Sequence, residues 1–155
     1  MKKILILGVT IAISTFAGAQ AHDRHTAEAA ESGQVRSVPG GTTIQIAGSY
    51  DAVFEGLVTY LKKSGYSVDE ANKESGLVAT SMEIDGGWKQ TGKRLVFSVI
   101  KDKSTSTAVR VAVSIQKRMK LLQTEPWGDP KVDEKASADL AHKVQTELPA
   151  QLARN

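Results

Sequence analysis

The sequence of 155 residues contains no cysteine. This absence excludes disulfide bonds, thiolate catalysis and cysteine-ligated metal sites, and it also excludes a lipid-modified cysteine at an export cleavage site. With 13 glycines, 4 prolines and no dominant low-complexity tract, the chain does not fit the collagen-like or wholly disordered classes either. The fold must therefore be stabilised by core packing alone, which a domain of about 130 residues can supply.

Histidine is almost as scarce, which limits the chemistry open to the chain. The three histidines are His22, His25 and His142. A Ser-His-acid group needs a histidine held beside its nucleophile, but the first two lie in a polar tail and His142 is expected to face water on a helix. We therefore predict that the protein is not an enzyme. A small enzyme with an unrecognised acid-base site, built from carboxylates on the predicted strands and turns, is the alternative that stays open.

The first 21 residues have the order of a secretory signal peptide. Lys2 and Lys3 form a positive start, an apolar run extends from Ile4 to Ala19, and small residues follow at cleavage spacing. We predict cleavage after Ala21 or Ala19, a periplasmic or secreted protein, and no transmembrane or lipid anchor after cleavage. Removal of the two lysines lowers the formal net charge of +3 by two, so no nucleic acid is predicted as a partner.

The remaining chain divides into a tail and one domain. Residues 22–41 are polar and end in a Pro-Gly-Gly sequence, which predicts a flexible N-terminal tail. Residues 42–155 are predicted to form a single domain. It opens with a short strand over residues 42–47, in which Ile44 and Ile46 share one side.

Two segments have the spacing of amphipathic helices. Apolar side chains recur at helical intervals from Tyr50 to Leu61, with Ser49 as a cap and Gly65 as an exit. A second helix is predicted over residues 133–148, before Pro149 disturbs it.

Between the helices the hydrophobic period is two, which is typical of half-buried antiparallel strands. Turn residues separate four such runs, at residues 66–71, 77–84, 93–101 and 107–117. We therefore predict an α+β fold in which an antiparallel five-stranded sheet has two helices on one face, in the order β-α-β-β-β-β-α.

This order of elements resembles the TATA-binding-protein-like or helix-grip arrangement over about residues 42–152. The run YDAVFEGLVTYLKKSGYSVDEANKESGLVAT, residues 50–80, is similar to domains of bacterial envelope accessory proteins, including a lipoprotein of the outer-membrane β-barrel assembly machinery. The resemblance is architectural and carries no catalytic motif. It implies a domain that binds other proteins, although the chain lacks the lipidated cysteine of that lipoprotein.

The predicted binding surface is the sheet face that points away from the helices. Small and apolar residues are more common there than a solvated face requires, so we predict contact with a protein partner in the cell envelope, with a second copy or with an apolar ligand. The simpler interpretation is a mildly apolar face that is solvated. Trp127, in the turn-rich loop before the second helix, is a further contact candidate, and the simpler interpretation is that it folds back over the edge of the core. The candidate residues on the sheet are Leu77, Ala79, Val96, Ile100, Arg110, Ala112, Ser114 and Gln116.

The sequence predicts no obligatory cofactor, but the tail leaves a metal site open. Cleavage after Ala21 makes His22 the new terminus, where its amine and imidazole can chelate Cu(II) with His25 as a third nitrogen donor. Cleavage after Ala19 instead places His22 third in the chain, an arrangement that suits square-planar Cu(II) or Ni(II). A periplasmic metal-binding protein is therefore the alternative function, and the simpler interpretation is that both histidines are solvated.

Overall fold

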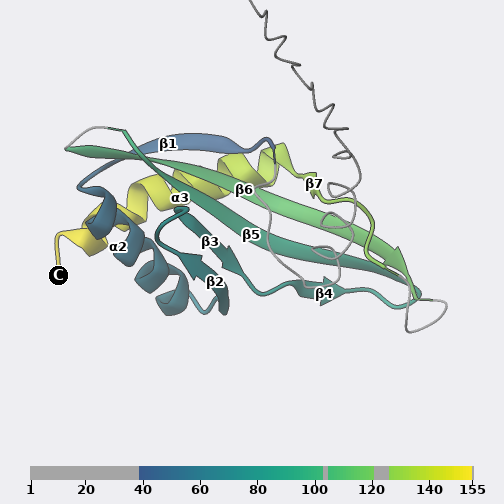
Figure 1. Ribbon diagram of the computed structural model, residues 1–155. Helices are drawn as coiled ribbons and strands as arrows, with labels where there is room; N and C mark the ends of the chain where they lie inside the picture. The colour runs from purple at the N-terminus through teal and green to yellow at the C-terminus, as the bar shows by residue number, and fades with distance from the viewer. Residues whose placement is uncertain (1–38, 103–104, 121–125, 155) are drawn as a thin grey trace, which may run out of the picture. The chain divides into compact units, whose positions relative to one another are not determined.

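The computed structural model describes residues 39–102, 105–120 and 126–154, which form an antiparallel sheet with two helices packed on one face (Figure 1). This confirms the α+β class, the antiparallel sheet and the two helices. The prediction of five strands is wrong, because the sheet has seven. The elements are β1 (Thr42–Ala47), α2 (Tyr50–Lys63), β2 (Val68–Asn72), β3 (Leu77–Thr80), β4 (Glu83–Asp85), β5 (Lys89–Lys101), β6 (Ser106–Met119), β7 (Lys131–Val132) and α3 (Glu134–Leu152).

The strands lie in the order β1-β6-β5-β3-β2, while β4 pairs with β5 and β7 with β6. One additional strand arises because the strand predicted over residues 77–84 is interrupted after Thr80. At this break the N–H of Ser81 donates to the carbonyl of Ser67 at 2.8 Å, and the Thr80 hydroxyl accepts the N–H of Leu95 at 3.1 Å. The other additional strand, β7, has two residues, which is too short for a periodic signal.

β5 and β6 form the longest ladder of the sheet, with thirteen residue pairs in register. β5 begins at Lys89, four residues before the predicted strand over residues 93–101, and β6 continues to Met119 rather than ending at Lys117. The outer end of this ladder extends past the helices (Figure 1).

α2 forms as its sequence predicts. The Ser49 hydroxyl accepts the N–H of Ala52, Asp51 lies in the first turn, and Lys62 and Lys63 lie in the last turn, where each charge complements the helix dipole. The buried residues on its apolar face include Val53, Phe54, Leu57, Tyr60 and Leu61.

α3 is longer than predicted. The Asp133 carboxylate accepts the N–H of Ala136 at 3.0 Å and starts the helix, which continues through Pro149 to Leu152. The predicted end before Pro149 is therefore wrong. The residue lies in the last turns of the helix, where its carbonyl still accepts the N–H of Ala153 at 3.1 Å.

Ser137 joins α3 to the sheet. β1 pairs with β6 as far as Val111 and β7 resumes the pairing at Ser114, so Val113 falls in the gap between them. The buried Ser137 hydroxyl accepts the Val113 N–H at 2.9 Å, and the Asp133 N–H donates to the Val113 carbonyl at 2.9 Å. The backbone N–H and the carbonyl of Val113 thus both have hydrogen-bond partners, and the start of α3 is fixed against β6.

The core lies between the helices and one sheet face. Alternate residues of the central strands point into it and are buried against both helices. These inward residues are Ile44, Ile46, Val78, Leu95, Phe97, Val99, Val109, Val111 and Val113.

Tyr60 connects the two helices through a hydrogen bond. Its hydroxyl donates to the Glu147 carboxylate at 2.8 Å, and the Tyr60 side chain is almost fully buried. Burial, followed by this contact with Glu147, raises the pKa of Tyr60 to about 12. The protonated phenol is therefore the form that the fold stabilises.

We predict that this phenol makes stability depend on pH in the alkaline range. Because the pKa of Tyr60 is about 12 in the fold and about 10 when unfolded, its contribution is complete below pH 10 and is lost as the pH rises toward 12. Chemical denaturation should show that the free energy of unfolding of Tyr60→Phe falls by on the order of 2 kcal/mol less than that of the parent as the pH rises from about 10 to about 12. The half-exposed Tyr66 supplies the control, since Tyr66→Phe should keep the steep fall. Parallel curves for Tyr60→Phe and the parent would contradict the assignment.

Candidate functional site

The sheet face opposite the helices, here called the outer face, has a regular side-chain pattern along β5 and β6. Residues paired across this ladder point to the same face, so the register divides it into successive rungs. Rungs with an arginine alternate with rungs of apolar, small or amide side chains. The outer-face pairs in order are Ser98–Arg110, Val96–Ala112, Arg94–Ser114, Gly92–Gln116 and Gln90–Arg118.

Three of the four arginines in the described part of the chain lie on the outer face: Arg94, Arg110 and Arg118. Successive arginines are separated by four residues along the ladder, a distance of about 13 Å at the usual rise of a strand. They therefore form a regular row of positive charges, which we call the arginine row.

Neighbouring side chains hold two of the three arginines of the row in place. Arg94 is only 17% exposed and pairs with Asp69 at 3.3 Å. The Arg118 guanidinium lies 4.3 Å from the centre of the Trp127 ring, and its Nε donates to Gln90 at 2.8 Å. A guanidinium held in this way retains further N–H donors for an anionic ligand.

Trp127 folds back onto the outer face. It is half-buried and stacks under Arg118 on one side. Gly92 allows the close approach, because a Cβ at that position would lie 3.1 Å from the Trp127 ring and 2.4 Å from the Met82 sulfur. Trp127 thus forms part of the same surface as the arginine row.

The structure brings the predicted sheet residues onto one face but corrects their exposure. Ala112 was expected to face solvent, yet it is 2% exposed, because the backbone of Gly41 and the Val132 side chain pack beside it. Ser114 is also buried, Arg110 and Gln116 are half-buried, and Ile100 is exposed. The buried apolar cluster comprises Leu77, Ala79, Val96 and Ala112.

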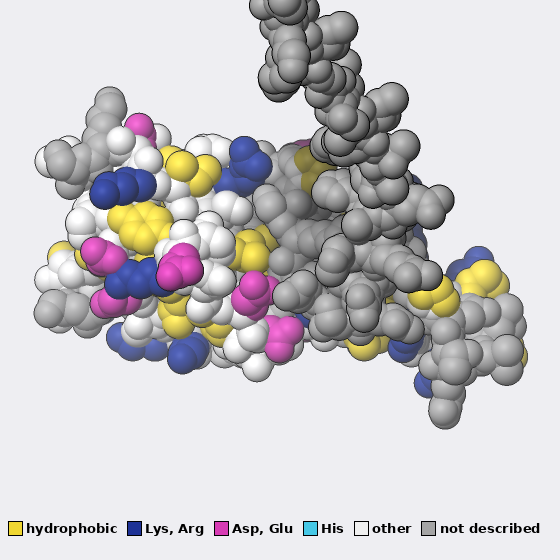
Figure 2. Space-filling view, in the orientation of Figure 1, with side chains coloured by type: hydrophobic (Ala, Val, Ile, Leu, Met, Phe, Trp, Pro, Cys, Tyr) yellow, Lys and Arg dark blue, Asp and Glu magenta, His cyan; other side chains and the backbone are white. Residues whose placement is uncertain are grey.

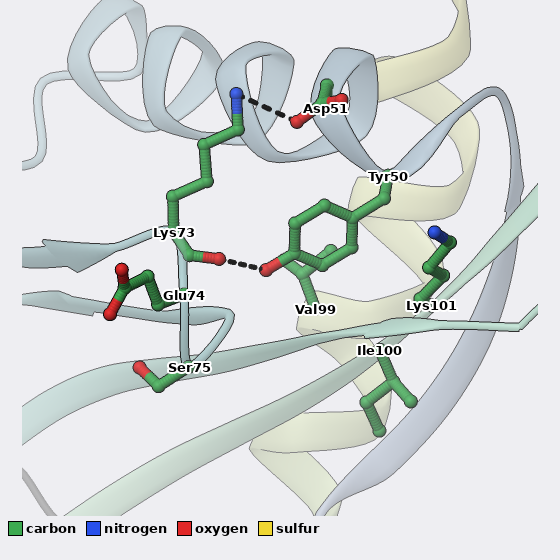
Figure 3. Close-up of a pocket in the computed structure, with 8 residues that line it drawn as sticks. All are labelled: Tyr50, Asp51, Lys73, Glu74, Ser75, Val99, Ile100 and Lys101. Carbon is green, nitrogen blue, oxygen red and sulfur yellow. Dashed lines mark hydrogen bonds and ion pairs between the residues drawn. The ribbon is translucent and has the colours of Figure 1, made fainter.

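A separate pocket lies near the start of α2 (Figure 3). Lys73 pairs with Asp51 at 2.8 Å and Glu55 at 3.0 Å, and its carbonyl accepts the Tyr50 hydroxyl. Hydrogen bonds to Asp51 and then Glu55 raise the pKa of Lys73, and burial followed by the Asp51 charge raises the pKa of Tyr50. Lysine stays charged and tyrosine neutral at pH 7, so neither side chain supplies a base there. The contacts tie the turn between β2 and β3 to α2.

No protein-family model matches this sequence, and no curated protein matches it. Within the described residues, no helix is long and apolar enough to cross a membrane, and no group of three or more His, Asp or Glu side chains has the arrangement of a metal site. The predicted metal ligands His22 and His25 lie outside the described residues.

Sequence reasoning placed Arg110 on the outer face but missed the rest of the arginine row. In the paired strands, Arg94 and Arg118 occupy positions that point to the same face as Arg110. The alternation of side chains along the strands could therefore have identified them. The predicted strand begins only at residue 93, and this hid the pairing of Gln90 with Arg118.

We predict that Gly92→Ala displaces Trp127. The added methyl group would overlap the Met82 sulfur and press on the indole, so Trp127 should become more exposed. Its fluorescence emission, measured in a Trp88→Phe background, should shift to longer wavelength. Gly87→Ala is the matched control, because no atom lies within 4 Å of its added Cβ. An unchanged spectrum for Gly92→Ala would show that the indole does not rest on β5.

Proposed function

We propose that this protein is a non-enzymatic accessory protein of the bacterial cell envelope, periplasmic or secreted, which binds another protein through its outer face. The observation that carries the proposal is the arginine row, which alternates with apolar and small rungs on the face opposite the helices. The signal-like order of residues 1–21 supports export.

The chemistry of the face favours a partner with acidic side chains. Arginine presents a planar set of N–H donors that matches a carboxylate through two parallel hydrogen bonds. An extended segment with a carboxylate at every fourth residue would repeat at the same interval of about 13 Å as the arginine row.

A second copy of the chain is a poorer match for this face. In a face-to-face dimer the arginine rows of two copies would approach each other, and like charges brought together out of water cost free energy. We therefore favour a different protein over self-association.

The test is crosslinking of the protein in the cells that produce it, with Arg110→Glu as the variant. Arg110 is half-buried at one end of the arginine row, between Thr43 on β1 and Ser98 on β5. Charge reversal there should reduce the crosslinked partner at least about tenfold, since a carboxylate would meet the carboxylates of the partner.

Arg154→Glu is the matched control, because it makes the same charge change at an exposed arginine beyond the end of α3. It should crosslink like the parent. Circular dichroism and thermal unfolding establish that both variants fold. A folded Arg110→Glu protein that retains its crosslinks would overturn the proposal.

A further inference from the structure

The outer end of the β5–β6 ladder exposes large hydrophobic side chains that the proposed function does not use. Of the four such residues in the described ranges, Trp88, Ile84 and Met119 lie at this end, with exposures of 75%, 52% and 50%. They surround this end of the ladder from both sides. The Trp88 carbonyl accepts the N–H of Lys120 at 2.7 Å, Ile84 pairs with Gly92 on the outer face, and Met119 pairs with Lys89 on the helix-facing side. We call residues 83–94 and 115–120, which include the turn of the β4–β5 hairpin, the hairpin end.

The hairpin end lies beyond the helical layer. On the helix-facing side of the ladder, Leu95 and Val113 form a buried pair, but the next positions outward, Lys93, Thr91 and Lys89, carry polar side chains. In Figure 1 the ends of β4, β5 and β6 extend past both helices. The hydrophobic side chains are therefore carried on a projection rather than in a groove.

Charge is concentrated on the same projection. The hairpin end has six basic side chains against two acidic ones, whereas the remaining described residues have nine basic against eleven acidic. Figure 2 shows hydrophobic and basic side chains next to each other at this end. One acidic residue, Glu83, lies opposite Lys93 in the register of β4 and β5. The other, Asp85, accepts the N–H of Gly86 at 2.7 Å through its carboxylate.

We propose that the hairpin end binds the surface of a bilayer containing anionic phospholipids. Trp88 has the amphipathic ring that is enriched at membrane interfaces, and Ile84 and Met119 can enter the apolar boundary beside it. The surrounding lysines attract anionic headgroups. The opposite net charge of the remaining body orients this end toward a negative surface.

An acidic protein is the competing ligand, since it shares the attraction to lysine. The exposed hydrophobic side chains decide in favour of lipid, because they project outward and a bilayer is a soft apolar phase that needs no preformed pocket. Arg94 and Arg118 belong to both surfaces, but the exposed hydrophobic side chains and the lysines that carry this inference lie outside the arginine row. The inference therefore does not depend on the proposed function.

The test is sedimentation of the protein in its predicted exported form, without residues 1–21, with vesicles of phosphatidylcholine, alone or mixed with phosphatidylglycerol. We expect binding to the mixed vesicles only, weakened by salt. In a Trp127→Phe background, emission from Trp88 should shift to shorter wavelength on binding, because the ring leaves water. The same measurement with soluble polyglutamate distinguishes an acidic-protein ligand.

Two variants separate the charge from the hydrophobic contribution. The triple variant Lys89→Gln, Lys117→Gln, Lys120→Gln should bind mixed vesicles at least about tenfold more weakly, and Trp88→Ser with Met119→Ser should do the same. The matched controls change equivalent groups elsewhere: Ile100→Ser at the opposite end of β5, and the triple variant Lys62→Gln, Lys63→Gln, Lys143→Gln on the helices. Both controls should bind like the parent.

The proposal is overturned by any of three results. The first is an absence of vesicle binding, including the case in which only polyglutamate binds. The second is equal binding to both kinds of vesicle. The third is parental binding by the folded hairpin-end variants, which would attribute the affinity to another part of the chain.

Discussion

The thirteen-pair ladder between β5 and β6 is the constraint from which the two proposed surfaces follow. Its register directs Leu95, Phe97 and Val99 toward the helices, and the same register fixes Arg94 and its neighbours on the outer face. A shift of one residue would exchange the two sets and bury the arginines in the core. Core packing on one side therefore determines the arginine row on the other, since a sheet cannot change one face without changing both.

The length of the ladder has a separate consequence. Helix coverage begins where Ser137 fixes α3 against Val113, so the pairs beyond that point have no helical layer over them. The exposed Trp88 and the lysines around it lie on this uncovered part. The overall charge of the chain conceals this arrangement, because the excess of acidic groups on the remaining body offsets the basic hairpin end.

Much of the fold could be predicted because its signals are local. Ser49 and the helical spacing of the apolar residues after it define α2. Hydrophobic residues at every second position define the parts of β5 and β6 that pack against the helices. The sequence could not predict the break after Thr80, since the hydrogen bond from Leu95 that satisfies its hydroxyl comes from a distant strand. It also could not predict that Ala112 is buried, because Gly41 and Val132 reach it through tertiary contacts. The candidate site was recovered only in part, because its arginines become neighbours through strand pairing.

The central claim is that the outer face is covered by a partner in the envelope, and the absence of native cysteine allows a direct measurement. A single thiol introduced by Ser98→Cys lies beside Arg110 on the outer face, and one introduced by Ser75→Cys lies on the exposed turn between β2 and β3. Maleimide should label both thiols in the purified protein. In intact cell envelopes, the account predicts that Ser98→Cys is protected while Ser75→Cys is still labelled. Equal labelling of the two in the envelope would contradict it.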